Sequence, residues 1–137
     1  MVTKRMKYHL DSSACVSTLR LPIGQEPTFL KQIGSEDIAV SSIVAAELEV
    51  GVFKSLRPEI QRARLDFFLF RFKVNDFDEV AARHYGEIRA ELERKGQSIG
   101  PMDLLIAAHA RSLGAALITA NIGEFKRVRG LKVIAWK

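Results

Sequence analysis

The sequence predicts an α/β fold in which helices cover both faces of a parallel sheet. Two observations predict it. Short apolar segments alternate with longer helical ones along the chain, as in strand–helix units. Glycine, proline and serine mark the boundaries between these segments. The chain has 137 residues and no glycine- or serine-rich linker, so we expect one domain over residues 1–137, with residues 1–6 as a short basic tail.

The first half of the chain contains two expected strands. A strand is expected at Lys7–Leu10, followed by a helix that Ser12 or Ser13 caps and that runs to about Leu19. Pro22 and Gly24 then indicate a loop. The remaining elements are a helix at Pro27–Ile33, a strand at Ile38–Val40, a helix from Ile43 to about Ser55 capped by Ser41 or Ser42, and a helix from Pro58 to about Phe72.

The second half continues the alternation from a strand at Lys73–Asn75. Asp76 and Glu79 form a pair like a capping box, which predicts a long helix over Phe77–Lys95 that Gly96 closes. The remaining elements are a helix over Met102–Leu113 that follows Gly100-Pro101 and ends at Gly114, a strand at Ala116–Thr119, a helical turn at Ile122–Lys126 and a strand at Leu131–Ala135. In such sheets ligands bind beyond the carboxyl ends of the strands.

The composition excludes several classes of protein. Cys15 is the only cysteine, so no internal disulfide forms, and a cytoplasmic location fits best. No apolar run reaches the roughly 20 residues of a membrane-spanning helix, and the basic N-terminus leads into no apolar signal core. We therefore expect no membrane contact. The net charge of +5 is compatible with a nucleic-acid partner, although a solvated surface also explains it.

Oxygen-bearing side chains follow the predicted strands. Asp11 directly follows the first strand, Asp103 lies in the first turn of a largely apolar helix, and Asn121 and Glu124 follow the strand that ends at Thr119. Taken singly, each has an ordinary structural role as a helix cap, a charge at a helix dipole or a loop residue. Together they place several oxygen ligands at one edge of one sheet.

The apolar helix from Ile43 supplies a further carboxylate. Glu47 and Glu49 both have apolar neighbours at helical spacing, so periodicity does not choose between them. Grouped carboxylates repel one another, and a divalent cation removes the repulsion. Oxygen ligands suit Mg²⁺ or Mn²⁺, and the histidines have no zinc-like spacing with Cys15 or with each other. The chemistry that such a site performs on phosphodiesters is hydrolysis.

Four segments resemble VapC-type toxins of the PIN-domain superfamily. Residues 8–14 read YHLDSSA and are similar to the family's opening strand and first acid, while residues 42–51 read SIVAAELEVG and are similar to its second motif. The third and most specific segment, residues 99–110, reads IGPMDLLIAAHA. The last, residues 117–125, reads LITANIGEF and precedes VRGLKV and a tryptophan. The segments follow the family's order over nearly the whole chain.

The resemblance implies a three-layer α/β/α PIN-like domain with a parallel sheet of about five strands. It also selects Glu47 over Glu49 as the second acid. The catalytic residues that it implies are Asp11, Glu47, Asp103, Asn121 and Glu124. The first three of these would bind one or two Mg²⁺ or Mn²⁺ ions. The fourth position stays open, because many relatives have an aspartate at the place of Asn121 and others use a glutamate further on, here Glu124.

The resemblance further implies an activity and partners. The activity is endonucleolytic hydrolysis of RNA, often transfer RNA, by a toxin that inhibits translation. The partners are a second copy of the chain in a homodimer and a small VapB-like antitoxin, which carries the DNA-binding domain. The alternative is a non-catalytic RNA- or protein-binding module with vestigial carboxylates. Doubly wound phosphotransferases also place an aspartate after the first strand, but they need a second acid close by, which Ser12-Ser13 does not supply.

Further residues are candidates for substrate and partner contacts. We expect Ser12 to hold a phosphate oxygen and Arg127 to contact the RNA backbone. Other candidate RNA contacts are Arg62, Arg64, Arg71, Lys126 and Arg129, although an ordinary solvated face explains each one alone. Core packing is the expectation for the crowded aromatics Phe67, Phe68, Phe70 and Phe72, with a dimer or antitoxin surface as the alternative.

Overall fold

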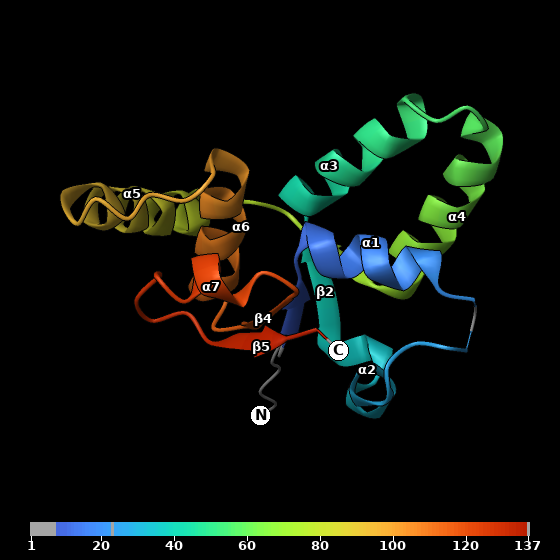
Figure 1. The fold of residues 1–137 in the computed structure, drawn as a ribbon, viewed down its shortest axis with the longest axis horizontal. Helices are drawn as coiled ribbons and strands as arrows, with labels where there is room; N and C mark the ends of the chain where they lie inside the picture. The colour runs from blue at the N-terminus through green and yellow to red at the C-terminus, as the bar shows by residue number, and fades with distance from the viewer. Residues whose placement is uncertain (1–7, 23, 137) are drawn as a thin grey trace.

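The computed structural model describes residues 8–22 and 24–136 and shows a five-stranded sheet flanked by helices (Figure 1). The expected basic tail, residues 1–6, lies outside the described residues. The strands are β1 Tyr8–Leu10, β2 Ile38–Ser41, β3 Lys73–Asn75, β4 Ala116–Thr119 and β5 Val133–Ala135. The helices are α1 Ser12–Arg20, α2 Thr28–Ile33, α3 Ser42–Phe53, α4 Pro58–Arg71, α5 Glu79–Arg94, α6 Pro101–Ser112 and α7 Ile122–Phe125. The 3₁₀ turn η1, Ser35–Asp37, was not predicted.

The sheet order is β3-β2-β1-β4-β5, and every neighbouring pair is parallel. The chain thus winds outward from β1 to β3 and returns to the other side of β1 for β4. Crossovers between parallel strands are right-handed, so helices that connect strands added in opposite directions along the sheet lie on opposite faces. The helices α1, α3 and α4 therefore cover one face, and α5 and α6 cover the other (Figure 1). This arrangement confirms the predicted three-layer fold. The reversal falls between β1 and β4, and such a switch point is where ligands bind.

The start of α1 differs from the prediction. Asp11 caps this helix, because its Oδ1 accepts the backbone N–H of Ala14 at 2.8 Å. The expected caps, Ser12 and Ser13, are instead the first two helical residues. The carboxylate thus satisfies a free N–H of the first turn while it also stands at the carboxyl end of β1.

The start of α5 also lies further along the chain than predicted. The helix begins at Glu79, and Asp78 caps it by accepting the N–H of Ala81 at 3.0 Å. The predicted cap at Asp76 and the start at Phe77 are therefore wrong. Two acids stand two residues apart here, and the pattern alone does not distinguish which of them reaches the free N–H of the first turn.

The central strands form the core. Every residue of β2 and β4 is buried, and Phe72 and Phe125 are among the largest side chains that are almost completely enclosed. The aromatic segment of α4 divides between two environments, since Phe68 is buried whereas Phe67 and Phe70 are 56% and 89% exposed. The core expectation thus holds for Phe68 and Phe72 alone. No helix in the described part of the chain is long and apolar enough to cross a membrane.

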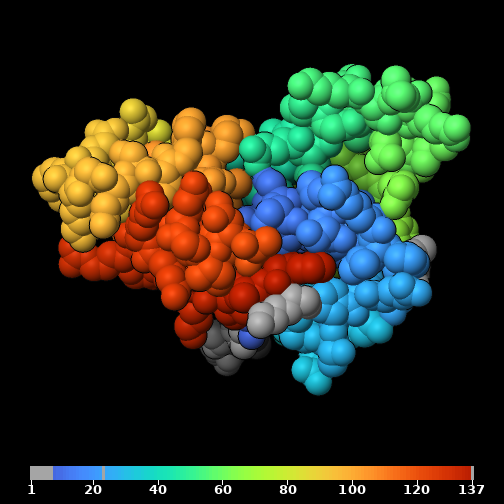
Figure 2. All heavy atoms as spheres, viewed as in Figure 1, coloured from blue at the N-terminus to red at the C-terminus, as the bar shows by residue number. Residues whose placement is uncertain are grey.

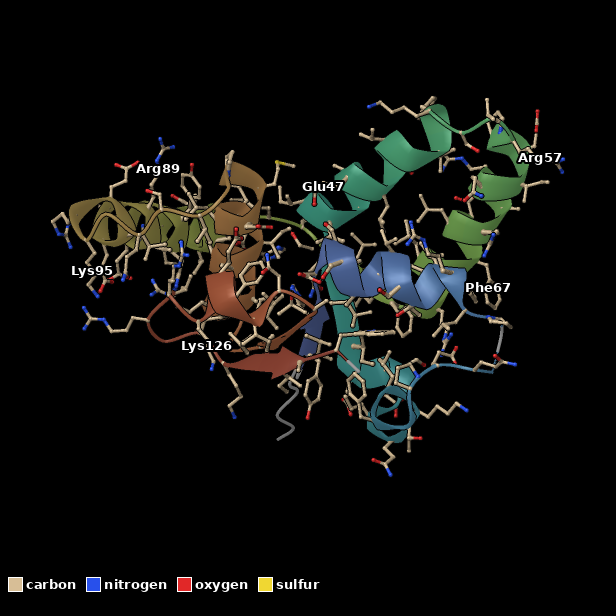
Figure 3. All side chains as sticks on the ribbon, viewed as in Figure 1. Glu47, Arg57, Phe67, Arg89, Lys95 and Lys126 are labelled. Atoms are coloured by element: carbon tan, nitrogen blue, oxygen red, sulfur yellow. The ribbon has the colours of Figure 1, made fainter. Side chains whose placement is uncertain are left out.

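The helices α3 and α4 project from the body of the protein as a pair (Figure 1). Their connection exposes two large apolar side chains, Phe53 at 79% and Leu56 at 100%. The space-filling view shows a notch between this pair and the α5–α6 pair, with α1 below it (Figure 2). Glu47 lies in the part of α3 that borders this notch (Figure 3).

Candidate functional site

Asp11 is held at the switch point by three hydrogen bonds. Its Oδ1 accepts the N–H of Ala14 and the hydroxyl of Ser13, each at 2.8 Å, and its Oδ2 accepts the hydroxyl of Thr119 from the end of β4. The backbone N–H of Asp11 donates to Ile118 O at 3.1 Å, so the main chain is joined to β4 as well. Only 3% of Asp11 is exposed. The carboxylate is therefore fixed in place by groups from α1 and β4.

Glu47 and Glu49 lie in different environments, although they are two residues apart on α3. The carboxylate of Glu47 accepts the hydroxyl of Ser12, which brings it to the start of α1 beside Asp11. Glu49 instead binds Arg62 of α4 through both of its oxygens, at 2.5 and 3.0 Å, and this hydrogen bonding lowers the pKa of its carboxyl. The structure thus places Glu47 with the other acids and Glu49 in an ion pair away from them.

Asp103 is the acid whose pKa is raised by its surroundings. It lies in the first turn of α6, and burial raises the pKa of its carboxyl to about 7. A hydrogen bond with Glu124 and the negative charges of Glu124, Asp11 and Glu47 act in the same direction. Three carboxylates from three other segments of the chain are therefore close enough to oppose the ionisation of Asp103.

Asn121 and Glu124 take different positions after β4. Glu124 faces Asp103, and its Oε1 is buried without a hydrogen-bond partner in the described residues. Asn121 is exposed, and its backbone N–H donates to the Thr119 hydroxyl at 2.8 Å. The structure thus brings Glu124 into the acidic cluster and leaves the Asn121 side chain at its edge.

The two predicted substrate contacts are engaged within the protein. The Ser12 hydroxyl donates to Glu47, so in this structure it orients a carboxylate. Arg127 donates to the carbonyl of Ser98 at 3.0 Å, in the loop that leads to Asp103. Contacts of either residue with RNA stay predictions.

Most of the other candidate RNA contacts also have partners. Arg62 binds Glu49, and Arg71 binds Glu26 at 2.6 Å. Arg129 binds Glu91 at 2.9 Å. Lys126 is exposed and forms no ion pair with a described residue.

The sequence reasoning missed two hydroxyl residues of the site. Thr119 donates to Asp11 and accepts from Asn121, and Ser13 donates to Asp11 and accepts the N–H of Ala120 at 3.1 Å. The available signal was the position of Thr119 as the last and only polar residue of a fully buried strand. A buried hydroxyl needs a partner, and here that partner is the carboxylate.

The acids of the site are not neutralised by an ion pair in the part of the chain that the structure describes. Within residues 8–22 and 24–136, none of Asp11, Glu47, Asp103 and Glu124 forms an ion pair with lysine or arginine. In the same residues, no three acidic, histidine or cysteine side chains have the spacing of a preformed metal site. The donor set fits a hard divalent cation nonetheless, because all donors are oxygens and one buried carboxylate oxygen of Glu124 has no partner.

The chain is similar to proteins of one known family over nearly its whole length. The PIN domain family profile matches residues 8–131. Ribonuclease VapC2 of Rickettsia felis is 43% identical over 132 residues, which cover 96% of this chain and 98% of that protein. The tRNA(fMet)-specific endonuclease VapC of Salmonella typhimurium is 38% identical over 134 residues, with coverages of 96% and 98%. The crystal structure of VapBC2 from Rickettsia felis bound to a fragment of promoter DNA contains a chain that superposes with a TM-score of 0.86 at 41% identity, covering 96% of this chain and all of that one.

Proposed function

This chain belongs to the PIN-domain family and, within it, to the VapC-type toxins, and we propose that it is a Mg²⁺- or Mn²⁺-dependent endoribonuclease whose cleavage of RNA inhibits translation. The observation that carries the proposal is the meeting of four acids at Asp103, where burial and the neighbouring carboxylates together raise the pKa to about 7. If each acid served only as a helix cap or as a charge at a helix dipole, the four acids would have no reason to lie together. Their meeting leaves a negative cluster that a divalent cation would neutralise.

We assign the ligands of one or two divalent ions to Asp11, Glu47 and Asp103. When bound, the cation supplies charge neutralisation and Lewis acidity toward the phosphodiester. The other groups of the site position these carboxylates. Ser13 and Thr119 fix the Asp11 carboxylate, and the Ser12 hydroxyl orients that of Glu47.

Glu124 and Asn121 have separate proposed roles. Glu124 forms a hydrogen bond with Asp103, whose raised pKa of about 7 means that loss of its proton near neutral pH would prepare its carboxylate to hold the cation. The exposed Asn121 amide is in a position to orient the attacking water from the edge of the cluster. Hydrolysis then forms a bond between the water oxygen and phosphorus and breaks one ester bond of the RNA backbone.

The proposed partners follow from the relatives and from the exposed surface. The solved relatives include complexes named VapBC, so we propose a VapB-like antitoxin through which alone the protein would meet DNA. The exposed Phe53 and Leu56 at the α3–α4 connection suit a protein contact, which fits the proposed homodimer. Transfer RNA is a reasonable first substrate to test, since the Salmonella relative is named for one. We propose that the protein acts in the cytoplasm, in keeping with its single cysteine.

Cleavage of total RNA tests the proposal. The wild-type protein should cut RNA with Mn²⁺ or Mg²⁺ and lose this activity in EDTA, and Asp11→Asn and Asp103→Asn should be inactive while their circular dichroism matches the wild type. Mapping the cut ends would identify the substrate. Full activity in either variant contradicts the site assignment, and a wild type that binds neither Mg²⁺ nor Mn²⁺ favours the non-catalytic module instead.

A further inference from the structure

Glu47 also lines a pocket that lies outside the acidic cluster. This pocket, of about 370 Å³, opens beside Glu47 and extends between α1, α3 and α4. Its size lies within the range of roughly 300–1,000 Å³ that is typical of sites for small ligands. Val16, Leu48 and Val52 contribute apolar wall, and Gln61 adds an amide group. The pocket therefore adjoins the acidic cluster through Glu47 and has a lining suited to a ligand that is part polar and part apolar.

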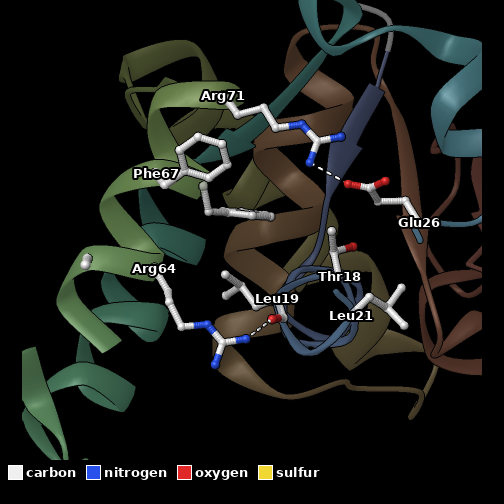
Figure 4. A pocket seen from close by; sticks show the side chains of 9 residues that line it. Thr18, Leu19, Leu21, Glu26, Arg64, Phe67 and Arg71 are labelled. Atoms are coloured by element: carbon white, nitrogen blue, oxygen red, sulfur yellow. Dashed lines mark hydrogen bonds and ion pairs between the residues drawn. The ribbon is translucent and has the colours of Figure 1, made fainter. Parts of the chain in front are cut away.

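Two arginines line this pocket without a carboxylate partner. Within the described residues, neither Arg20 nor Arg64 forms an ion pair, whereas Arg62 and Arg71 on the same helix as Arg64 are both paired. One Nη of Arg64 donates to the carbonyl of Leu19 at 2.6 Å (Figure 4). This bond holds the guanidinium at the pocket wall and leaves its other N–H groups available.

Arg64 also separates this pocket from a more apolar one. The neighbouring pocket, of about 270 Å³, shares Leu19 and Arg64 with it and is lined further by Phe67 and Phe68 (Figure 4). The paired residues Arg71 and Glu26 stand at the far side of that second pocket. Arg64 therefore lines both pockets, whereas Arg20 lines the pocket beside Glu47 and is not among the residues that line the second one.

We propose that the pocket beside Glu47 binds one nucleotide of the RNA strand next to the bond that is cut. Arg20 and Arg64 would hold its phosphate, since guanidinium groups bind phosphate oxygens through charge-assisted hydrogen bonds. The apolar wall would contact the ribose or base, and Gln61 has the donors and acceptors to meet a base edge. Arg20 and Arg64, which form no ion pair within the described residues, supply beside the acidic site the positive charge that a phosphate group needs. The proposal rests on the RNA-cleaving function above.

A glycine in the pocket allows a steric test. A Cβ placed on Gly51 of α3 would meet no atom within 4 Å, and the same holds for Gly86 of α5, outside the pocket. A side chain can therefore begin at either position without a clash at its Cβ, and leucine favours helix more than glycine does.

The binding of a fluorescently labelled single-stranded RNA is measured by anisotropy in an Asp11→Asn background, which prevents cleavage. Gly51→Leu should raise the Kd about tenfold by filling the pocket, and Gly86→Leu should leave it within about twofold.

The charges allow a second test on the same RNA. The double variant Arg20→Gln/Arg64→Gln should raise the Kd about tenfold. It should also reduce the salt dependence of binding, log Kd against log salt, by about 0.7 for each phosphate that the protein no longer neutralises. The matched control is Arg83→Gln/Arg94→Gln, which removes two exposed arginines of α5 that have no ion pair among the described residues. It should change the Kd by about twofold at most.

The outcomes separate this proposal from the catalytic one. If Gly51→Leu and the Arg20/Arg64 pair bind RNA as their controls do, the nucleotide site is wrong even though the wild type cleaves RNA. If they weaken RNA binding and the wild type cleaves no RNA, the site stands and the catalytic proposal fails. If they leave RNA binding unchanged and weaken the complex with the antitoxin instead, the pocket is an antitoxin site and the nucleotide proposal is overturned.

Discussion

Nδ1 of His109 lies 2.7 Å from the hydroxyl oxygen of Ser41, and this buried contact joins the two helices that carry Asp103 and Glu47. Ser41 caps α3 by accepting the N–H of Ile43 at 3.0 Å, so we assign its hydroxyl hydrogen to His109. Burial lowers the pKa of the His109 imidazole, which keeps the ring neutral and able to accept this hydrogen. The contact therefore fixes α6 relative to α3 behind the acidic cluster.

Removing the ring should destabilise the protein. His109→Leu leaves the buried Ser41 hydroxyl without its acceptor, and we expect the free energy of unfolding to fall by about 2 kcal/mol or more. His109→Asn places a carbonyl oxygen where Nδ1 stood and should recover part of that loss. Urea denaturation measures both. A leucine variant as stable as the wild type would show that the contact contributes nothing.

The metal-free protein should lose stability as the pH rises. The pKa of Asp103 is raised from 3.8 to about 7, so between these values the folded protein keeps a proton that the unfolded chain has released. The free energy of unfolding therefore falls with increasing pH across this interval. Asp103→Asn removes the titration, and after allowance for solvent screening we expect it to be more stable than the wild type by about 2 kcal/mol at pH 8 in EDTA.

Thermal unfolding from pH 4 to pH 8 measures this difference. Because all other titrating groups are shared, the wild-type and Asp103→Asn curves should diverge only through that interval. Added Mg²⁺ or Mn²⁺ should stabilise the wild type at the upper end and have little effect on the variant. Parallel curves in EDTA would mean that burial and the neighbouring carboxylates do not raise the pKa of Asp103.

Glu47 and Glu49 offer a matched comparison on one helix. Glu47→Gln removes a charge from the acidic cluster and should lower kcat by about 100-fold or more. Glu49→Gln breaks only the partly exposed pair with Arg62 and should cost about 0–1 kcal/mol of stability without loss of cleavage. RNA cleavage rates of the two variants decide the matter, and equal rates would refute the placement of Glu47 in the site.

Thr119 should act through Asp11. Thr119→Val keeps the shape of the side chain but removes the hydroxyl that donates to the Asp11 carboxylate. We expect metal affinity to fall by about 10-fold, as for other groups that orient a metal ligand, whereas Thr119→Ser should keep it. Metal titration of cleavage activity gives both affinities, and a valine variant with unchanged affinity would assign Thr119 a packing role alone.

The strand–helix alternation sufficed to predict the fold, and the end of each strand located the acids. The β4 strand was predicted at both ends because Gly114 precedes it and a polar segment follows Thr119. The sequence did not distinguish Glu47 from Glu49, because both have apolar neighbours along the helix. Their difference comes from Ser12 and Arg62, which other segments bring to them.

Other features depend on contacts between distant segments. Thr119 reads as an ordinary strand residue until β4 lies beside β1 and places its hydroxyl on Asp11. The arginines of α4 look alike in the sequence, and only the fold shows that Arg62 and Arg71 are paired while Arg64 has no carboxylate partner among the described residues. Spacing along one helix carries no information on such partners.

The central claim is that Asp11, Glu47 and Asp103 form one divalent-cation site. Isothermal titration with Mn²⁺ at neutral pH tests it most directly, on the wild type, on Asp11→Asn/Asp103→Asn and on the control Glu49→Gln. We expect the wild type and Glu49→Gln to bind Mn²⁺ with the same affinity and the double variant to show no heat of binding while it remains folded. Equal Mn²⁺ affinity in all three proteins would contradict the account.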